Sequence, residues 1–424
     1  MEIICKKSNL LGEILIPGSK SQVIRALVIA TLAEGTSKII NPLLSDDSAA
    51  CIAGCRAFGA DVLEKESLIE VTGVGGKPRT PTADVFLGNS GISNTFLAGA
   101  AAHAKGPSVL TGGDSLRARP FSPLCDGIND LGAKAESFDG TGRPPLIVSG
   151  YLEGGFTEID GVNSQPVSSL IVNSALAKMD TEISVLNPSE TPYVEMTLKW
   201  LDEQKIKYNA AKDFSSYKVR GEQEYKSFEK TIPADWSSAC FSLCAAVVTP
   251  RSEVLVKGLD FSESQGDKEI INVLKKMGAE IKVNSDGVRV RSANLEGTEI
   301  DLSKTPDALP ILAVVGCFAE GETRLVNVAH ARIKETDRIK SMSEGLRKMG
   351  ANIEELPDGL VIRKSKLCGA SLNGCNDHRT IMSLAIAGIN AQGETRISTA
   401  EGINKTYPSF VNSMKKLGAQ MEVI

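Results

Sequence analysis

The hydrophobic and polar positions of the chain repeat about every 71 residues. In each copy an amphipathic helical pattern ends at a Gly-Ala pair, and two short alternating segments separated by a turn follow. Glycine suits the end of a helix, where a positive φ is needed, and the alternation predicts a β-hairpin. A sixth copy has Lys205-Ile206 in place of Gly-Ala. The glycines of the other five copies are Gly59, Gly132, Gly278, Gly350 and Gly418.

A second, almost wholly apolar helical segment lies between each hairpin and the next amphipathic helix. Examples are residues 22–33, 237–248, 306–319 and 377–391. Each begins with polar or charged residues, which predicts a helix buried along its length with only its N-terminus exposed. Six copies therefore predict an α/β (α+β) chain in two groups of three repeats, with helices inside and sheets outside. The helix N-termini would provide amide-lined, positive ends for an anionic ligand.

Composition is that of an ordinary globular protein: 424 residues, 42% hydrophobic and 23% charged, with a net charge of −5. This charge argues against a nucleic-acid-binding surface. The first ten residues lack a signal-peptide core, and the longest apolar stretch, 308–319, is too short to span a bilayer, so we expect a cytoplasmic protein. Nine cysteines without a CxxC pair and only three histidines argue against a metal centre and favour buried, free thiols.

Candidate chemistry gathers at the predicted helix starts. Each motif is weak alone: a lysine in a Gly-Ser loop is more often a solvated surface charge, and "KETDR" is also typical of an exposed helix face. The stretch "GSKS" is not a phosphate-binding P-loop, because Ser19 stands where glycine is needed. Together the cations predict an anion site, since buried charges need counter-charges. The motifs are "PGSKS" with Arg25, "LGNSG" at 87–91, Arg119-Pro120, Ser164-Gln165, "PYVEMTL" at 192–198, "PDALP" at 306–310, "RIKETDR" at 332–338, "NDHR" at 376–379 and "NKTYP" at 404–408.

This ordered set resembles that of the EPSP synthases (3-phosphoshikimate 1-carboxyvinyltransferases) of the enolpyruvyl transferase family, over essentially the whole chain. The resemblance implies two similar domains, each of three βαβαββ repeats, in the inside-out α/β barrel of that family. It also implies that the chain crosses twice between the domains. One domain would then span residues 19–233 and the other residues 1–18 plus 234–424, with the active site in the cleft between them.

The resemblance implies transfer of the enolpyruvyl group of phosphoenolpyruvate to the 5-hydroxyl of shikimate 3-phosphate, with release of phosphate, in the pathway to aromatic amino acids. Asp307 matches the family's base for the hydroxyl, and Glu335 and Lys20 match its acid/base candidates for the methylene carbon. No metal or organic cofactor is implied, and we expect a monomer that binds small molecules but neither nucleic acid nor a membrane. The implied phosphoenolpyruvate-binding residues are Lys20, Gly91, Arg119, Gln165, Arg338, Arg379 and Lys405. The implied acceptor-binding residues are Lys20, Ser21, Arg25, Asn163, Ser164, Gln165, Tyr193, Asp307 and Lys334.

The acceptor side departs from the family pattern. Val23, Asn163 and Glu190 stand where the family has serines, and an arginine expected after "GNSG" is replaced near Thr95. Either Ser164 and its neighbours suffice to hold the acceptor's phosphate, or the acceptor is a different hydroxylated acid, as in a sister enolpyruvyl transferase. The sister that acts on UDP-N-acetylglucosamine usually has a cysteine in the loop before its Arg-Pro, which is absent here. If the acceptor carries a 3-phosphate, we expect Glu190 to turn away from it, because an acid beside a phosphate is repulsive.

Overall fold

The computed structural model describes residues 1–424, and the chain divides into two compact units. Unit 1 contains Met1–Pro17 and Ala234–Ile424, and unit 2 contains Gly18–Pro233. The first crossing lies one residue before the boundary expected from the sequence, and the second follows Pro233.

Unit 2 contains three four-stranded sheets with one common strand order. In each sheet the first two strands are parallel and the remaining neighbours are antiparallel. Each sheet contains the strands of one sequence repeat, except that the first sheet takes its first strand, β14, from the end of the unit. The sheets are β14 (Glu229–Thr231), β3 (Thr36–Ile40), β5 (Leu68–Thr72), β4 (Asp61–Lys65); β6 (Val85–Phe86), β7 (Ser108–Thr111), β9 (Leu146–Ser149), β8 (Lys134–Ser137); and β10 (Gly155–Asp160), β11 (Thr181–Leu186), β13 (Ser216–Val219), β12 (Tyr208–Ala210).

Unit 1 repeats the same strand order three times. Its last sheet is completed by the N-terminal strand, because Ile3 pairs with Ile397 on one side and Val423 on the other. A two-stranded ladder joins β18 (Leu295–Glu296) to β20 (Ala319–Glu320). The sheets are β2 (Leu11–Leu15), β15 (Glu253–Lys257), β17 (Gly287–Arg291), β16 (Ile281–Asn284); β19 (Glu299–Asp301), β21 (Glu322–Val326), β23 (Gly359–Arg363), β22 (Asn352–Leu356); and β24 (Ser371–Asn373), β25 (Glu394–Ser398), β1 (Ile3–Lys6), β26 (Gln420–Val423).

An amphipathic helix precedes the hairpin of five repeats, as the sequence predicts, and in the last repeat it precedes the single strand β26, which pairs with β1. Gly59 and Gly350 follow their helices with φ values of 106° and 90°, and Lys205 takes the same left-handed region, at 59°, in the copy that lacks the glycine. The 3-10 turn η1 (Gly266–Glu269) leads into one of these helices, and a short helix, α4 (Asp114–Arg117), precedes another. The helices are α2 (Asp46–Ala57), α5 (Ser122–Asp130), α7 (Thr191–Glu203), α9 (Ile270–Lys276), α11 (Arg338–Lys348) and α13 (Phe410–Lys416).

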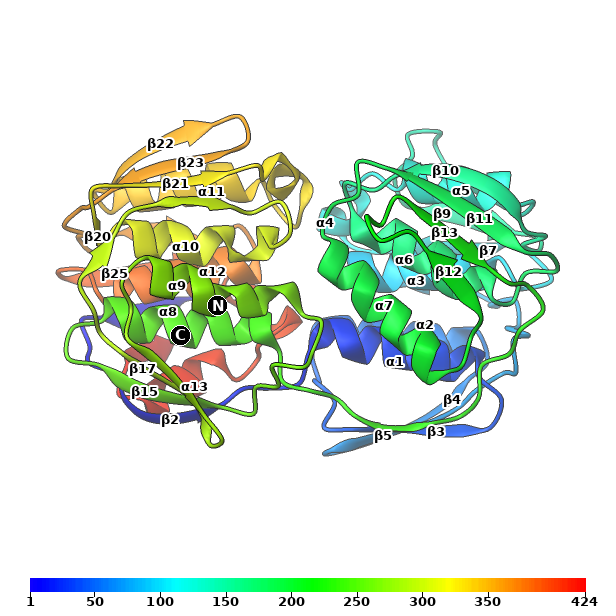
Figure 1. Cartoon of the computed structure of the whole chain (residues 1–424), viewed down its shortest axis with the longest axis horizontal. Coiled ribbons are helices and arrows are strands. Elements are labelled where there is room, and N and C mark those ends of the chain that lie inside the picture. The colour runs from blue at the N-terminus through cyan, green and yellow to red at the C-terminus, as the bar shows by residue number, and fades with distance from the viewer. The chain divides into compact units, whose positions relative to one another are not determined.

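The apolar helices are buried along most of their length, which confirms the predicted arrangement of helices inside and sheets outside. In unit 1, Figure 1 shows α8, α10 and α12 lying between the sheet that contains β15 and the sheet that contains β21. No helix is both long and apolar enough to cross a membrane. The helices are α1 (Lys20–Leu32), α3 (Gly91–Ala101), α6 (Ser164–Ser174), α8 (Trp236–Val248), α10 (Leu309–Gly316, after the 3-10 turn η2, Pro306–Ala308) and α12 (His378–Gly388).

Candidate active site

In unit 1, a fully buried arginine at the start of α11 binds three carboxylates. Arg338 donates from Nε to Asp377 Oδ2, from Nη1 to Asp307 Oδ1 and from Nη2 to Glu335 Oε2, each at 2.7 Å. Buried charges of this kind are tolerated only when they are paired. We call Asp307, Glu335, Arg338, Asp377 and Arg379 the arginine cluster.

Asp307 joins the two arginines of this cluster. Its Oδ1 accepts from Arg338 Nη1 and its Oδ2 lies 2.7 Å from Arg379 Nη2, which also donates to Ser237 Oγ at 3.0 Å. Burial alone would raise the pKa of Asp307, but Arg379, Arg338 and Lys334 outweigh it and hold this pKa well below its usual range. The two guanidinium groups thus bind one carboxylate between them. A carboxylate or phosphate group of a ligand needs the same arrangement of donors.

The helix starts explain why these side chains meet. Asp377 is the N-cap of α12, where its carboxylate accepts from the Arg379 amide at 3.1 Å as well as from Arg338. Asp337 is the N-cap of α11 and is itself held by Arg332 at 2.7 Å. The carboxylate of an acidic N-cap accepts hydrogen bonds from the first amides of a helix and interacts favourably with the positive end of the helix dipole. The capping residue of α12 therefore also orients the arginine that begins α11.

Two further lysines of unit 1 belong to the predicted site. Lys405, at the end of the 3-10 turn η4 (Ala400–Lys405), is buried and donates from Nζ to the Asn376 carbonyl at 3.1 Å, directly before Asp377. Lys334 precedes Glu335, is half-buried, and is close enough to Asp307 to lower the pKa of its carboxyl group. The cluster and these lysines combine four cations with three carboxylates, so the region stays net positive.

In unit 2, Arg25 links α1 to neighbouring helices. It donates from Nε to Thr197 Oγ1 at 2.8 Å, from Nη1 to the Ser21 carbonyl at 3.0 Å and from Nη2 to the Tyr193 carbonyl at 2.8 Å. Its guanidinium also lies 5.2 Å from the centre of the Phe96 ring. Burial lowers the pKa of Arg25 to about 10, so it keeps its charge at neutral pH. Arg25 thus positions α1 against α3 and α7.

In unit 2, Lys20 begins α1, and Arg119 lies in the loop between α4 and α5. Lys20 Nζ lies 3.2 Å from Asp47 Oδ2 of α2, and both side chains are largely buried. Arg119 packs onto the first residue of α3, because a Cβ atom at Gly91 would lie 2.5 Å from Arg119 Nη1. Only glycine allows this approach of the guanidinium to the helix start.

The start of α6 is held by two side chains. Asn163, its N-cap, accepts from the Gln165 amide through Oδ1 at 3.0 Å. Glu190 accepts through Oε2 from the Ser164 amide at 3.3 Å and from Ser164 Oγ at 2.9 Å. The sequence led us to expect Glu190 to turn away from an acceptor phosphate bound by Ser164. In the structure the buried Glu190 carboxylate is instead directed at Ser164.

The structure thus brings Asp307, Glu335, Arg338 and Arg379 together in unit 1, whereas the predicted residues of unit 2 form several separate contacts. It also adds two residues that the sequence analysis did not assign. Asp377 and Asp47 are the carboxylate partners of Arg338 and Lys20. The sequence contained a signal for both residues, because each of these acids stands at a helix start beside a predicted site cation or motif. Asp377 directly precedes "HR", and Asp47 lies in the "SDDS" cap of α2.

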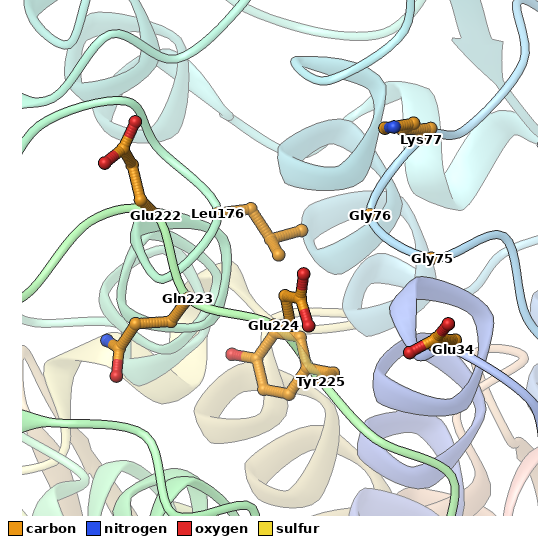
Figure 2. A pocket seen from close by; sticks show the side chains of 9 residues that line it. All are labelled: Glu34, Gly75, Gly76, Lys77, Leu176, Glu222, Gln223, Glu224 and Tyr225. Carbon is orange, nitrogen blue, oxygen red and sulfur yellow. The ribbon is translucent and has the colours of Figure 1, made fainter.

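A separate cavity of unit 2, of about 380 Å³, contains none of the predicted residues (Figure 2). It lies beyond the C-terminal end of α1, about 20 Å from Lys20 by the rise of that helix. Glu34, Glu222 and Glu224 line it, and Lys226 pairs with Glu34 and Glu224 at 2.7 and 2.8 Å. Three carboxylates make this cavity unsuited to an anionic substrate.

Comparison with known proteins decides the family. The family model of EPSP synthase (3-phosphoshikimate 1-carboxyvinyltransferase) matches residues 4–414. The chain belongs to the EPSP synthase family. A protein of Acetivibrio thermocellus with the name 3-phosphoshikimate 1-carboxyvinyltransferase is 49% identical over 416 residues, covering 98% of each chain. Relatives of the same name from Ruminiclostridium cellulolyticum and Methanocaldococcus jannaschii are 48% and 41% identical, each covering 99% of both chains.

The solved EPSP synthase of Acinetobacter baumannii confirms the fold. It superimposes with a TM-score of 0.84 at 25% sequence identity and covers 99% of both chains. The two-domain inside-out α/β fold of EPSP synthase is therefore the fold of this chain.

Proposed function

We propose that the chain transfers the enolpyruvyl group of phosphoenolpyruvate to the 5-hydroxyl of shikimate 3-phosphate and releases phosphate. Beside membership of the family, one observation carries the proposal: Arg338 and Arg379 both bind the Asp307 carboxylate. Phosphoenolpyruvate brings a carboxylate and a phosphate, and buried arginines bind such groups through paired hydrogen bonds. A base candidate thus lies beside the groups that bind the anionic substrate.

The reaction needs one base and one acid. In the addition step the 5-hydroxyl oxygen bonds to C2 of phosphoenolpyruvate, its proton passes to Asp307, and the methylene carbon C3 gains a proton from Glu335 or Lys20. In the elimination step C3 returns a proton, the bond between C2 and the phosphate oxygen breaks, and phosphate leaves. No redox change occurs, so these side chains suffice for the proton transfers.

Substrate binding and base activation are coupled in this proposal. Both oxygens of Asp307 contact arginines in the structure: Oδ1 accepts from Arg338 and Oδ2 forms an ion pair with Arg379. When the anionic groups of phosphoenolpyruvate bind Arg338 and Arg379, they take over these donors. Asp307 then regains an oxygen that can accept the hydroxyl proton, and its pKa rises toward its ordinary value because its cationic partners are shared.

We assign the remaining predicted residues to binding. Lys20, Gly91, Arg119, Gln165 and Lys405 join the two arginines around phosphoenolpyruvate, and the positions of Arg119 against Gly91 and of Lys405 beside Asp377 support this. The acceptor is assigned to Lys20, Ser21, Arg25, Asn163, Ser164, Gln165, Tyr193, Asp307 and Lys334. Because the residues come from both units, we propose that one reaction requires both.

The test is phosphate release from phosphoenolpyruvate with a panel of acceptors: shikimate 3-phosphate, shikimate and UDP-N-acetylglucosamine. We expect efficient release only with shikimate 3-phosphate, retained in Asp286→Asn, an exposed control in unit 1, and lost in Asp307→Asn. Efficient release with another acceptor and none with shikimate 3-phosphate would overturn the proposal.

We further propose a cytoplasmic monomer that needs no metal or organic cofactor. Its nine free cysteines, seven of them buried, suit a reducing compartment. Size-exclusion chromatography with light scattering tests the monomer. An unchanged rate after dialysis against EDTA tests the independence from metal.

A further inference from the structure

We propose that Glu190 is a specificity-determining residue, whose carboxylate competes with the acceptor's phosphate for the start of α6 and so sets how tightly that phosphate binds. This inference rests on the proposed function, and it concerns a position where the chain departs from the family's serine.

The first turn of α6 has few backbone donors to offer. Its first three residues are Ser164, Gln165 and Pro166, and proline has no amide hydrogen. The Gln165 amide donates to the Asn163 side chain, and the Ser164 amide donates to Glu190. The Ser164 hydroxyl donates to the same Glu190 oxygen. A phosphate bound at Ser164 must therefore take over the two donors that Glu190 uses in this structure.

The backbone holds Glu190 in this place. Glu190 has φ 48° and ψ 31°, a left-handed conformation that a glutamate seldom adopts, and Asn187 in the same loop has φ 50°. The loop is fastened to the residues before α6, since the Gly161 amide donates to the Leu186 carbonyl at 2.6 Å and the Ser189 amide donates to the Gly161 carbonyl at 3.0 Å. A strained residue persists only where its surroundings enforce it, and such positions cluster at ligand sites.

The competition has a defined consequence for substrate choice. An acceptor with a phosphate has to displace Glu190 or bind beside a like charge, whereas an acceptor without one leaves the bonds from Ser164 to Glu190 intact. Removing the charge of Glu190 should therefore strengthen binding of shikimate 3-phosphate and leave binding of shikimate unchanged. Phosphoenolpyruvate, whose proposed partners include Arg338 and Arg379, should be affected little.

The experiment compares wild type with Glu190→Gln, which keeps the shape of the side chain, and Glu190→Asn, which suits a left-handed backbone. Glu195→Gln is the matched control, because it removes one exposed carboxylate from the same helix. Calorimetry gives the Kd of shikimate 3-phosphate, shikimate and inorganic phosphate, and steady-state kinetics gives the KM of phosphoenolpyruvate.

We expect both Glu190 variants to lower the Kd of shikimate 3-phosphate about tenfold, the size expected from one like charge at close range. The Kd of shikimate and the KM of phosphoenolpyruvate should stay within twofold, and Glu195→Gln should match wild type. An unchanged or weaker affinity for shikimate 3-phosphate in Glu190 variants that fold normally would overturn the inference. If wild type neither binds nor turns over shikimate 3-phosphate, the proposed function fails. The inference then stands or falls on whether the variants bind inorganic phosphate more tightly.

Discussion

Asp307→Asn should separate the two tasks that we propose for the arginine cluster. We expect at least a hundredfold loss of kcat, because a general base contributes a factor of roughly 100 to 10,000. We also expect phosphoenolpyruvate to bind as tightly as in wild type or more tightly. The reason is that the Asp307 carboxylate accepts from Arg338 at 2.7 Å and forms an ion pair with Arg379 at 2.7 Å, and so competes with the substrate for both.

The size of the binding effect follows from these two contacts. A hydrogen bond to a charged partner contributes about 1.5–3 kcal/mol, and one to a neutral partner about 0.5–1.5 kcal/mol. An asparagine keeps only one acceptor oxygen, so it binds one arginine by the weaker hydrogen bond and turns an amide donor toward the other, which lowers the cost of releasing the pair by about 2 kcal/mol. This corresponds to a Kd for phosphoenolpyruvate that is up to about thirtyfold lower.

The assay pairs kcat from phosphate release with the Kd of phosphoenolpyruvate from calorimetry, with Asp286→Asn as the control for loss of one carboxylate from unit 1. Circular dichroism establishes that the variant is folded. A kcat within tenfold of wild type would refute the role of Asp307 as base. A Kd more than tenfold weaker would refute the competition, and would show that Asp307 holds the arginines in place for the substrate.

Three further outcomes follow from the geometry. Gly91→Ala should displace the Arg119 guanidinium, which would lie 2.5 Å from the new Cβ, and should raise the KM of phosphoenolpyruvate about tenfold with a smaller effect on kcat. Asp377→Asn should keep the cap of α12 but lower the free energy of unfolding by about 2 kcal/mol in urea titrations. The loss is smaller than the roughly 3–5 kcal/mol for breaking an isolated buried pair, because Asp307 and Glu335 still neutralise Arg338. Because the pKa of Asp307 is held below its usual value, its ion pairs stabilise the fold fully above about pH 4 and are lost as the pH falls further. The melting temperatures of wild type and Asp307→Asn should therefore differ at pH 6, and the difference should shrink as the pH falls below about 4.

The repeat architecture could be predicted because it depends on local patterns. Each hairpin follows a helix that ends in a left-handed residue, and Lys205 adopts that conformation even without glycine. No local pattern indicates which segment of the chain supplies the third strand of the last sheet. That strand is Ile3–Lys6, more than 380 residues from its partner in β25, and pairing at this distance leaves no trace in local periodicity.

The candidate site could be predicted in its residue types but not in its pairings. The motifs identified Arg338 and Asp307, yet nothing in the spacing indicates that one guanidinium binds three carboxylates, since side-chain direction depends on tertiary packing. Glu190 shows the same limit. The sequence reveals an acid where a serine was expected, but its turn toward Ser164 depends on a left-handed backbone and a fastened loop.

The most direct test of enolpyruvyl transfer by acid and base is the reaction run in D₂O with phosphoenolpyruvate and shikimate 3-phosphate, followed by proton NMR. We predict one new product, the enolpyruvyl ether at the 5-hydroxyl. Deuterium should appear in its vinyl methylene group, because C3 gains a solvent-derived proton and later loses one. No product with shikimate 3-phosphate, or a product whose methylene group carries no deuterium, would contradict the account.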